Sequence, residues 1–145
     1  MFSLNIYPQV GGESIYNFLN LTGSARQAAL GGNVLTLLDD VNQPVWNPST
    51  INQELDHKVG VNYLNFLGDI NYVSVSYAFM PSRHIGTFHL GVNYLNYGTF
   101  IGADEEGTET GSFKAYDLAI STGYAYNFHR SDFFIGTNVK LINSV

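Results

Sequence analysis

The sequence predicts an all-β protein: an antiparallel outer-membrane β-barrel whose first strands follow a compact N-terminal plug segment. Three observations support this prediction: long strands with alternating polar and apolar side chains, a low charge content, and connections of unequal length. The polar positions of these strands carry Gly, Ala, Ser, Thr and Asn. Strands with one apolar and one polar face suit a barrel wall that separates lipid from a polar interior.

The composition agrees with a membrane barrel. Of the 145 residues, 12% are charged, whereas about 25% is usual in soluble domains. Tyr and Phe number 10 each, and Tyr gathers at the headgroup level of membranes. The net charge of −6 argues against nucleic acid as a partner. Cysteine is absent, which excludes disulfides and thiolate metal sites, and no apolar run is long enough for a transmembrane helix.

The start of the chain, residues 1–8, is apolar and has no basic residue. It is either the remnant of a signal peptide, with the mature chain starting near Gln9, or an ordinary first strand. Residues 9–57 do not alternate, and they are predicted to form a plug folded into the barrel lumen.

Within this plug, Ser14–Leu21 has a weak pattern that fits either a helix or an extended segment. A short helix is expected over Ala25–Leu30, with Ser24 as its N-cap and Gly31 and Gly32 ending it.

The strands are predicted to occupy residues 58–145, and they are expected at 58–66, 70–80, 84–97, 113–126 and 132–143. Residues 81–83 and 127–131 are predicted tight turns, and 98–112 is predicted to be a long acidic loop. Outer-membrane barrels have short periplasmic turns and longer external loops, so the acidic loop is expected outside the cell. Because about eight strands are needed to close such a barrel, we expect the chain to be the N-terminal part of a longer protein.

One sequence stretch nearly repeats: Gly60–Phe66 (GVNYLNF) recurs as Gly91–Tyr97 (GVNYLNY). On the barrel interpretation both copies run outward, and their aromatic residues reach the same membrane interface. The alternative is chance similarity between two strands of biased composition.

Two groups of residues in the plug are candidate structural sites. Arg26 is expected to form an ion pair inside the plug with one or both of Asp39 and Asp40. Trp46 is expected to anchor packing before Asn47 and Pro48, or alternatively to line a path through the lumen. The Asn-Pro step requires an extended or turn conformation at Asn47.

The predicted external loop carries a cluster of four acidic residues: Asp104, Glu105, Glu106 and Glu109. Their spacing does not match an EF-hand, so we interpret them as solvated and as a candidate contact surface for a partner protein. The sequence contains no P-loop, no common serine-nucleophile motif and no helical histidine pair for a metal. These common catalytic and metal-binding motifs are therefore absent from the sequence, and no cofactor is expected.

The N-terminal motifs resemble a known family. The N-terminal part of this chain resembles the N-terminus of the PorQ family in four stretches: Gly11–Ser14, Phe18–Leu21, Ser24–Arg26 and Ala29–Gly32. Asp39-Asp40 and Trp46–Pro48 fit the wider PorV/PorQ group, which itself resembles the FadL-type fatty-acid transporters, although Ser49 stands where that group typically has Ala. Four later stretches are also similar to PorQ proteins: Gly60–Phe66, Asp69–Ala78, Gly91–Gly98 and Gly111–Asp117.

The resemblance implies a FadL-like barrel of about fourteen strands, of which this chain holds the plug and about five. It further implies an integral, lipid-contacting outer-membrane component of the Bacteroidetes type IX secretion system, without enzymatic activity. Its implied partners are a PorZ-like surface protein and the PorU and PorV components of the attachment complex.

Two other functions remain open. The first is a FadL-like transporter of hydrophobic small molecules, although the inward positions, mostly Ala, Ser, Asn and Gly, are polar and narrow for a fatty-acid site. The second is a soluble β-sandwich binding module, which requires the apolar strand faces to pack against a second sheet.

Overall fold

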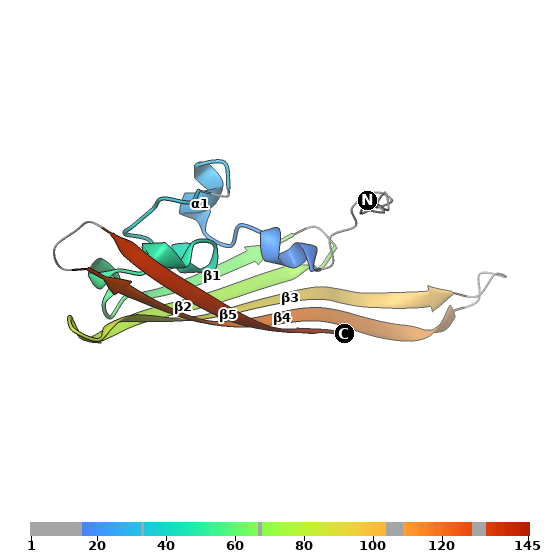
Figure 1. The fold of residues 1–145 in the computed structure, drawn as a ribbon. Helices are drawn as coiled ribbons and strands as arrows, with labels where there is room; N and C mark the ends of the chain where they lie inside the picture. Colours follow the sequence, from blue (N-terminus) through green and yellow to red (C-terminus); the bar gives the residue numbers. More distant parts are fainter. Residues whose placement is uncertain (1–15, 33, 67, 104–108, 129–132) are drawn as a thin grey trace, which may run out of the picture.

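The computed structural model describes residues 16–32, 34–66, 68–103, 109–128 and 133–145. Its main feature is one antiparallel sheet of five strands that pair in sequence order. The strands are β1 (Val59–Asn65), β2 (Asn71–Ser82), β3 (Gly86–Ala103), β4 (Glu109–Asn127) and β5 (Phe134–Ser144). The predicted all-β antiparallel class is therefore confirmed for the described residues (Figure 1).

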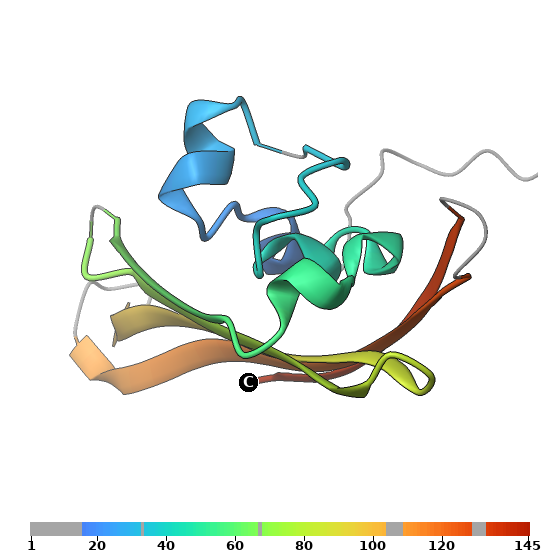
Figure 2. The ribbon, with the colours of Figure 1, turned by 90° about the vertical axis from the view of Figure 1, so that its left-hand side faces the viewer.

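The described residues from 16 to 58, here called the N-terminal segment, contain only short helical pieces. These are η1 (Asn17–Asn20), α1 (Ala25–Ala29), η2 (Gln43–Val45), η3 (Pro48–Thr50) and η4 (Gln53–Leu55). Figure 2 shows that the sheet is curved and that the N-terminal segment lies on its concave side. Within the described residues, no helix combines the length and the apolar character needed to cross a membrane.

The local structure of the N-terminal segment agrees with the sequence in part. Residues 14 and 15 of the segment 14–21 lie outside the described residues, and the rest contains a helical turn, η1. Helix α1 lies where it was predicted and ends at Gly31 and Gly32, both of which have positive φ. The predicted N-cap is wrong: the side chain of Ser24 makes no capping hydrogen bond. It instead borders a narrow polar cavity, which Ser74 also lines.

The structure corrects most of the predicted loop 98–112. β3 continues to Ala103 and β4 already begins at Glu109, so most of the stretch is a paired hairpin. Its Gly-rich, acidic composition predicted a loop, but a register shift after Asn96 and the positive φ of Gly98 let the ladder continue. Beyond this bulge the rings of Phe100 and Phe113 stack across the strands, with their centroids 5.2 Å apart.

The predicted turns also shift at their ends. β2 extends through Pro81 to Ser82, so the turn begins later than the predicted 81–83. Pro81 lies inside a register irregularity of β2, where its missing amide costs no ladder hydrogen bond. β4 runs to Asn127, and residues 129–131 of the predicted turn 127–131 lie outside the described residues.

The two copies of the near-repeat lie on either side of β2 in the same register. Ser76 of β2 pairs with Gly60 on one side and with Gly91 on the other. Asn71, at the opposite end of β2, likewise pairs with Asn65 and Asn96. The equivalent residues of the repeat therefore reach the same end of the sheet.

Candidate functional site: the sheet face covered by the N-terminal segment

In a soluble domain a sheet usually buries its apolar face and exposes its polar face. Here the polar face is buried and the apolar face is exposed. The covered face lies under the N-terminal segment and buries small or polar residues: Ser74, Ser76, Ala78, Thr87, His89, Asn93, Ala119, Ser121 and Ala125. The bare face exposes apolar residues: Val59, Val61, Tyr63, Val75, Leu90, Val92, Ile120, Ile135, Val139 and Leu141. A continuous exposed apolar surface indicates contact with a membrane or with another protein.

The soluble sandwich needs a second sheet on the bare face. Within the described residues the single sheet has no such partner, and the side chain of Leu141, for example, is 70% exposed. The alternation read from the sequence assigned these residues correctly to one face. The predicted plug placed residues 9–57 on the polar face, and the described N-terminal segment does cover that face.

Glycines on the covered face let the N-terminal segment approach closely. A Cβ atom at Gly60 would lie 2.8 Å from Val41 Cγ1, and one at Gly123 would lie 2.7 Å from Ile51 Cδ1. A Cβ atom at Gly136 would collide with the backbone oxygen and carbon of Pro48. Larger side chains at these sites would hold the segment away from the strands.

Hydrogen bonds tie the N-terminal segment to four of the strands. The ring Nε2 of His89 on β3 lies 3.0 Å from the carbonyl oxygen of Val41. Asn138 of β5 donates from Nδ2 to the carbonyl oxygen of Pro44, over 3.1 Å.

At the other strands, Asn62 of β1 donates from Nδ2 to Asn42 Oδ1 over 2.9 Å, and the amide of Met80 on β2 donates to Asp56 Oδ1 over 2.7 Å. Accepting from the Met80 amide is the main reason why the pKa of Asp56 is lowered. The segment is thus fixed to both halves of the sheet.

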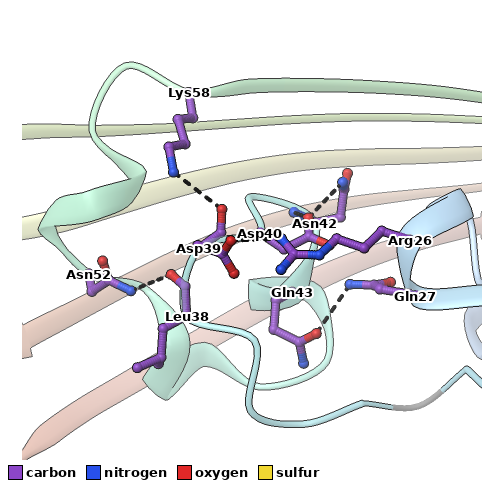
Figure 3. A network of polar contacts seen from close by, with 9 residues as sticks. All are labelled: Arg26, Gln27, Leu38, Asp39, Asp40, Asn42, Gln43, Asn52 and Lys58. Atoms are coloured by element: carbon purple, nitrogen blue, oxygen red, sulfur yellow. Dashed lines mark hydrogen bonds and ion pairs between the residues drawn. The ribbon is translucent and has the colours of Figure 1, made fainter. Parts of the chain in front are cut away.

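The predicted ion pair of Arg26 forms with Asp39, at 2.8 Å from Nη1 to Oδ2 (Figure 3). Asp40 has a different role: it is buried, and its Oδ1 accepts from the amide and the Nδ2 of Asn42, both at 2.9 Å. Lys58 also joins the cluster by donating from Nζ to the carbonyl oxygen of Asp39. The side chains of Arg26 and Asp39 are 50% and 53% exposed, so water screens the pair.

The Arg26 pair predicts a pH dependence. The hydrogen bond from Arg26 holds the pKa of Asp39 below its ordinary value. A lowered pKa means that the pair stabilises the fold above the ordinary carboxyl pKa of about 4, and that this is lost as the pH falls through the folded-state pKa. We expect Arg26→Gln to reduce the free energy of unfolding near pH 7 and to reduce it by clearly less at about pH 3, as measured by denaturant titration.

A matched control is Lys114→Gln, which removes an exposed cation from β4. This variant should show no such pH-dependent difference. A loss from Arg26→Gln of the same size at both pH values would contradict the role assigned to the pair.

The Trp-Asn-Pro motif builds the next turn. Trp46 follows η2, is half-buried and borders the narrow polar cavity. Asn47 is extended, as predicted, and its Oδ1 accepts from the amide and hydroxyl of Ser49, at 3.1 and 2.7 Å. Pro48 begins η3, which lies over Gly136.

Sequence reasoning missed a buried amide pair. Gln43 is fully buried; its Oε1 accepts from Gln27 Nε2 over 3.2 Å, and its own Nε2 donates to the carbonyl oxygen of Val34. No periodic pattern marks either glutamine, because their partners lie far away in the sequence.

The acidic cluster lies mostly outside the described part of the chain. Asp104, Glu105 and Glu106 are outside the described residues, and Glu109 begins β4. Among the residues that the structure describes, no group of three metal-ligating side chains comes together.

The covered face carries mostly small and polar residues but is apolar at one end. Tyr72 and Leu95 belong to this face and are buried against Phe18 of η1. Beside them lies the rim pocket, with a volume of about 300 Å³, lined by Asn17, Phe18, Leu21, Phe66, Ile70, Leu95 and Tyr97.

Comparison with protein-family models, curated proteins and solved structures finds no match for this chain. The family resemblance therefore rests on the motifs of the sequence, and function has to be argued from the geometry described above.

Proposed function

We propose that this chain forms the first part of an outer-membrane β-barrel, with the N-terminal segment as a plug inside the lumen. The observation that carries this proposal is the reversed distribution of side chains: the buried face is polar and the exposed face is apolar. A barrel wall requires this arrangement, because its outer face meets lipid chains and its inner face meets polar contents. Outer-membrane lipid is then the first partner of the bare face.

Within the outer membrane, we propose that the protein acts without catalysis, as an anchor for surface partners of the type IX secretion system. The support is the PorQ-like series of motifs in residues 11–48 together with the strand segments that resemble that family. The partners would be a PorZ-like surface protein and the PorU and PorV components of the attachment complex.

The β3–β4 hairpin is the candidate contact surface. It runs beyond Asn96, where the pairing with β2 ends, and so projects past the neighbouring strand (Figure 1). The four acidic residues Asp104, Glu105, Glu106 and Glu109 lie at and next to its tip in the sequence. Their charge would steer a basic patch of a partner towards the hairpin.

The test is a pull-down of the tagged full-length protein from detergent-solubilised outer membrane of the native host. Recovery of PorZ-like and PorU- or PorV-like proteins would support the anchor. A barrel recovered alone, or a protein absent from the membrane fraction, would contradict it.

The same pull-down tests the hairpin. Replacing all four acidic residues with Ser is expected to weaken partner capture mainly at low salt, because screening already suppresses the steering at high salt. Unchanged capture at low salt would remove the acidic tip from the interface.

A second candidate function is a FadL-like transporter of hydrophobic small molecules, and the rim pocket is the observation that favours it. Recovery of a barrel without protein partners but with a co-purified lipid would move the assignment to transport.

A further inference from the structure

We infer that a polar patch at one end of the bare face binds the phosphate group of a membrane lipid. This head-group patch consists of Tyr94, Asn96, Lys114 and Tyr116, at the end of the sheet from which the β3–β4 hairpin projects. The inference rests on the proposed barrel and deepens it, because it names the chemical group of the lipid and the side chains that hold it. It needs none of the secretion partners.

Tyrosines bracket the apolar part of the bare face. Along β4, Tyr116 and Tyr126 share this face with Leu118 and Ile120, which lie between them. Ten residues of a strand span about 34 Å. At the usual tilt of about 40° this corresponds to about 26 Å across the membrane, close to the height of the apolar band of outer-membrane barrels. Tyr116 therefore lies where lipid chains give way to head groups.

The bulge after Asn96 ends the lipid-facing wall at the same level. β3 carries one extra residue there while β4 stays regular, so Lys114 follows Tyr116 on the bare face and pairs with Thr99. The next pair, Phe100 and Phe113, stacks on the opposite face of the hairpin. The bare face thus changes from apolar to polar within one bulge, as it would at the boundary of the hydrocarbon layer.

The register makes the members of the head-group patch neighbours. Asn96 pairs directly with Tyr116, and Lys114 is the next residue of β4 on the same face. The rings of Tyr94 and Tyr116 contact each other across the strands, with their centroids 5.9 Å apart. Long side chains at such positions are within reach of one ligand.

The head-group patch offers hydrogen-bond donors and one positive charge. Lys114 is exposed, and among the described residues no carboxylate pairs with it. Asn96 Oδ1 accepts from the amide of Gly98 over 2.8 Å, which leaves the NH2 group of Asn96 to donate. The hydroxyls of Tyr94 and Tyr116 have no hydrogen-bond partner in the described part of the chain. A phosphate group, which is anionic and rich in acceptor oxygens, suits this set of donors.

The acidic residues of the hairpin do not cancel this attraction. Glu109 is the nearest of them to Lys114 in the sequence, and it lies about 17 Å further along β4. Exposed charges separated by more than the Debye length of about 8 Å are largely screened at physiological salt. The charge of Lys114 therefore dominates next to the tyrosines.

Native mass spectrometry of the full-length protein in detergent tests the inference. The protein is mixed with equal amounts of dioleoyl phosphatidic acid and dioleoylglycerol, which have the same chains and differ in the phosphate. We expect the wild type to retain about tenfold more phosphatidic acid, and Lys114→Gln to lower this ratio to about twofold. The matched control is Arg83→Gln, which removes an exposed cation from the β2–β3 turn at the opposite end of the sheet and should keep the wild-type ratio.

A second pair of variants separates hydrogen bonding from charge. Tyr116→Phe keeps the ring and removes the hydroxyl, so the ratio should fall about threefold, whereas Tyr126→Phe should leave it unchanged. The inference is overturned if the wild type retains both lipids equally, if Lys114→Gln keeps the tenfold ratio, if Arg83→Gln loses as much as Lys114→Gln, or if the two tyrosine variants behave alike.

The membrane fraction of the same cells tests the barrel separately. A wild-type protein that is absent from this fraction contradicts the barrel and the head-group patch together. A protein that inserts into the membrane but shows no preference for the phosphate overturns the head-group patch alone, and leaves the barrel and the anchor role untouched.

Discussion

Replacing Gly136 with alanine is expected to force residues 48 and 49 off the sheet and to lower the free energy of unfolding by about 3 kcal/mol. The added Cβ atom would collide with the carbonyl group of Pro48 and would lie 2.8 Å from the amide nitrogen of Ser49. These atoms belong to the backbone, so no change of rotamer relieves the contact. Either η3 or β5 must move.

Denaturant unfolding of the purified protein measures this loss, and limited proteolysis reports whether residues 34–58 become accessible. The matched control is Gly91→Ala, because Gly91 lies on the covered face of the sheet, as Gly136 does, but in β3. Its Cβ atom would approach the hydroxyl of Ser121 at 2.5 Å, and that side chain is able to rotate away. The control is expected to lose clearly less stability; an equal loss would point to the strand backbone rather than to the contact with Pro48.

Placing a lysine on the bare face is expected to cost about 2–4 kcal/mol in a bilayer, because the charge would meet lipid chains. Val92 is suitable, since it lies in the middle of β3 and is 39% exposed. If this face instead met water, the same change would alter stability by only about 0.5 kcal/mol. The measurement is the folding equilibrium of Val92→Lys in lipid vesicles compared with the wild type.

The control for this experiment is Leu30→Lys, because Leu30 is 56% exposed but lies next to α1 in the N-terminal segment. If Val92 and Leu30 are both exposed to water, both lysine substitutions should be harmless. The membrane proposal predicts that only the change at Val92 is costly. Equal tolerance of the two variants would contradict contact between the bare face and lipid.

The sequence predicted the strands well, since a period of two assigns each residue to a face whatever its distant neighbours are. It failed at the β3–β4 hairpin, where Gly98 and Glu109 were typical of a loop but lie in a bulged ladder. It also left out the contacts that seat the N-terminal segment. His89 contacts the carbonyl oxygen of Val41, 48 positions away in the chain, and no local sequence pattern predicts such a contact.

The sequence allowed only part of the rim pocket to be predicted. Tyr72 and Leu95 follow the same alternation as Ser74 and Asn93, so their place on the covered face could be read from the strands. What could not be read is that η1 brings Phe18 against them, because nothing in residues 14–21 specifies the end of the sheet on which that turn lies.

The hydrogen bond between Asn138 and Pro44 joins residues 94 positions apart, and this separation has a kinetic consequence. The N-terminal segment precedes all five strands in the sequence, yet part of the surface it packs on is supplied by β5. Closing so long a loop is slow, and it has to wait until the intervening strands have paired. We therefore expect the N-terminal segment to settle only after β1 to β5 have paired, so that its burial reports the assembly of this sheet.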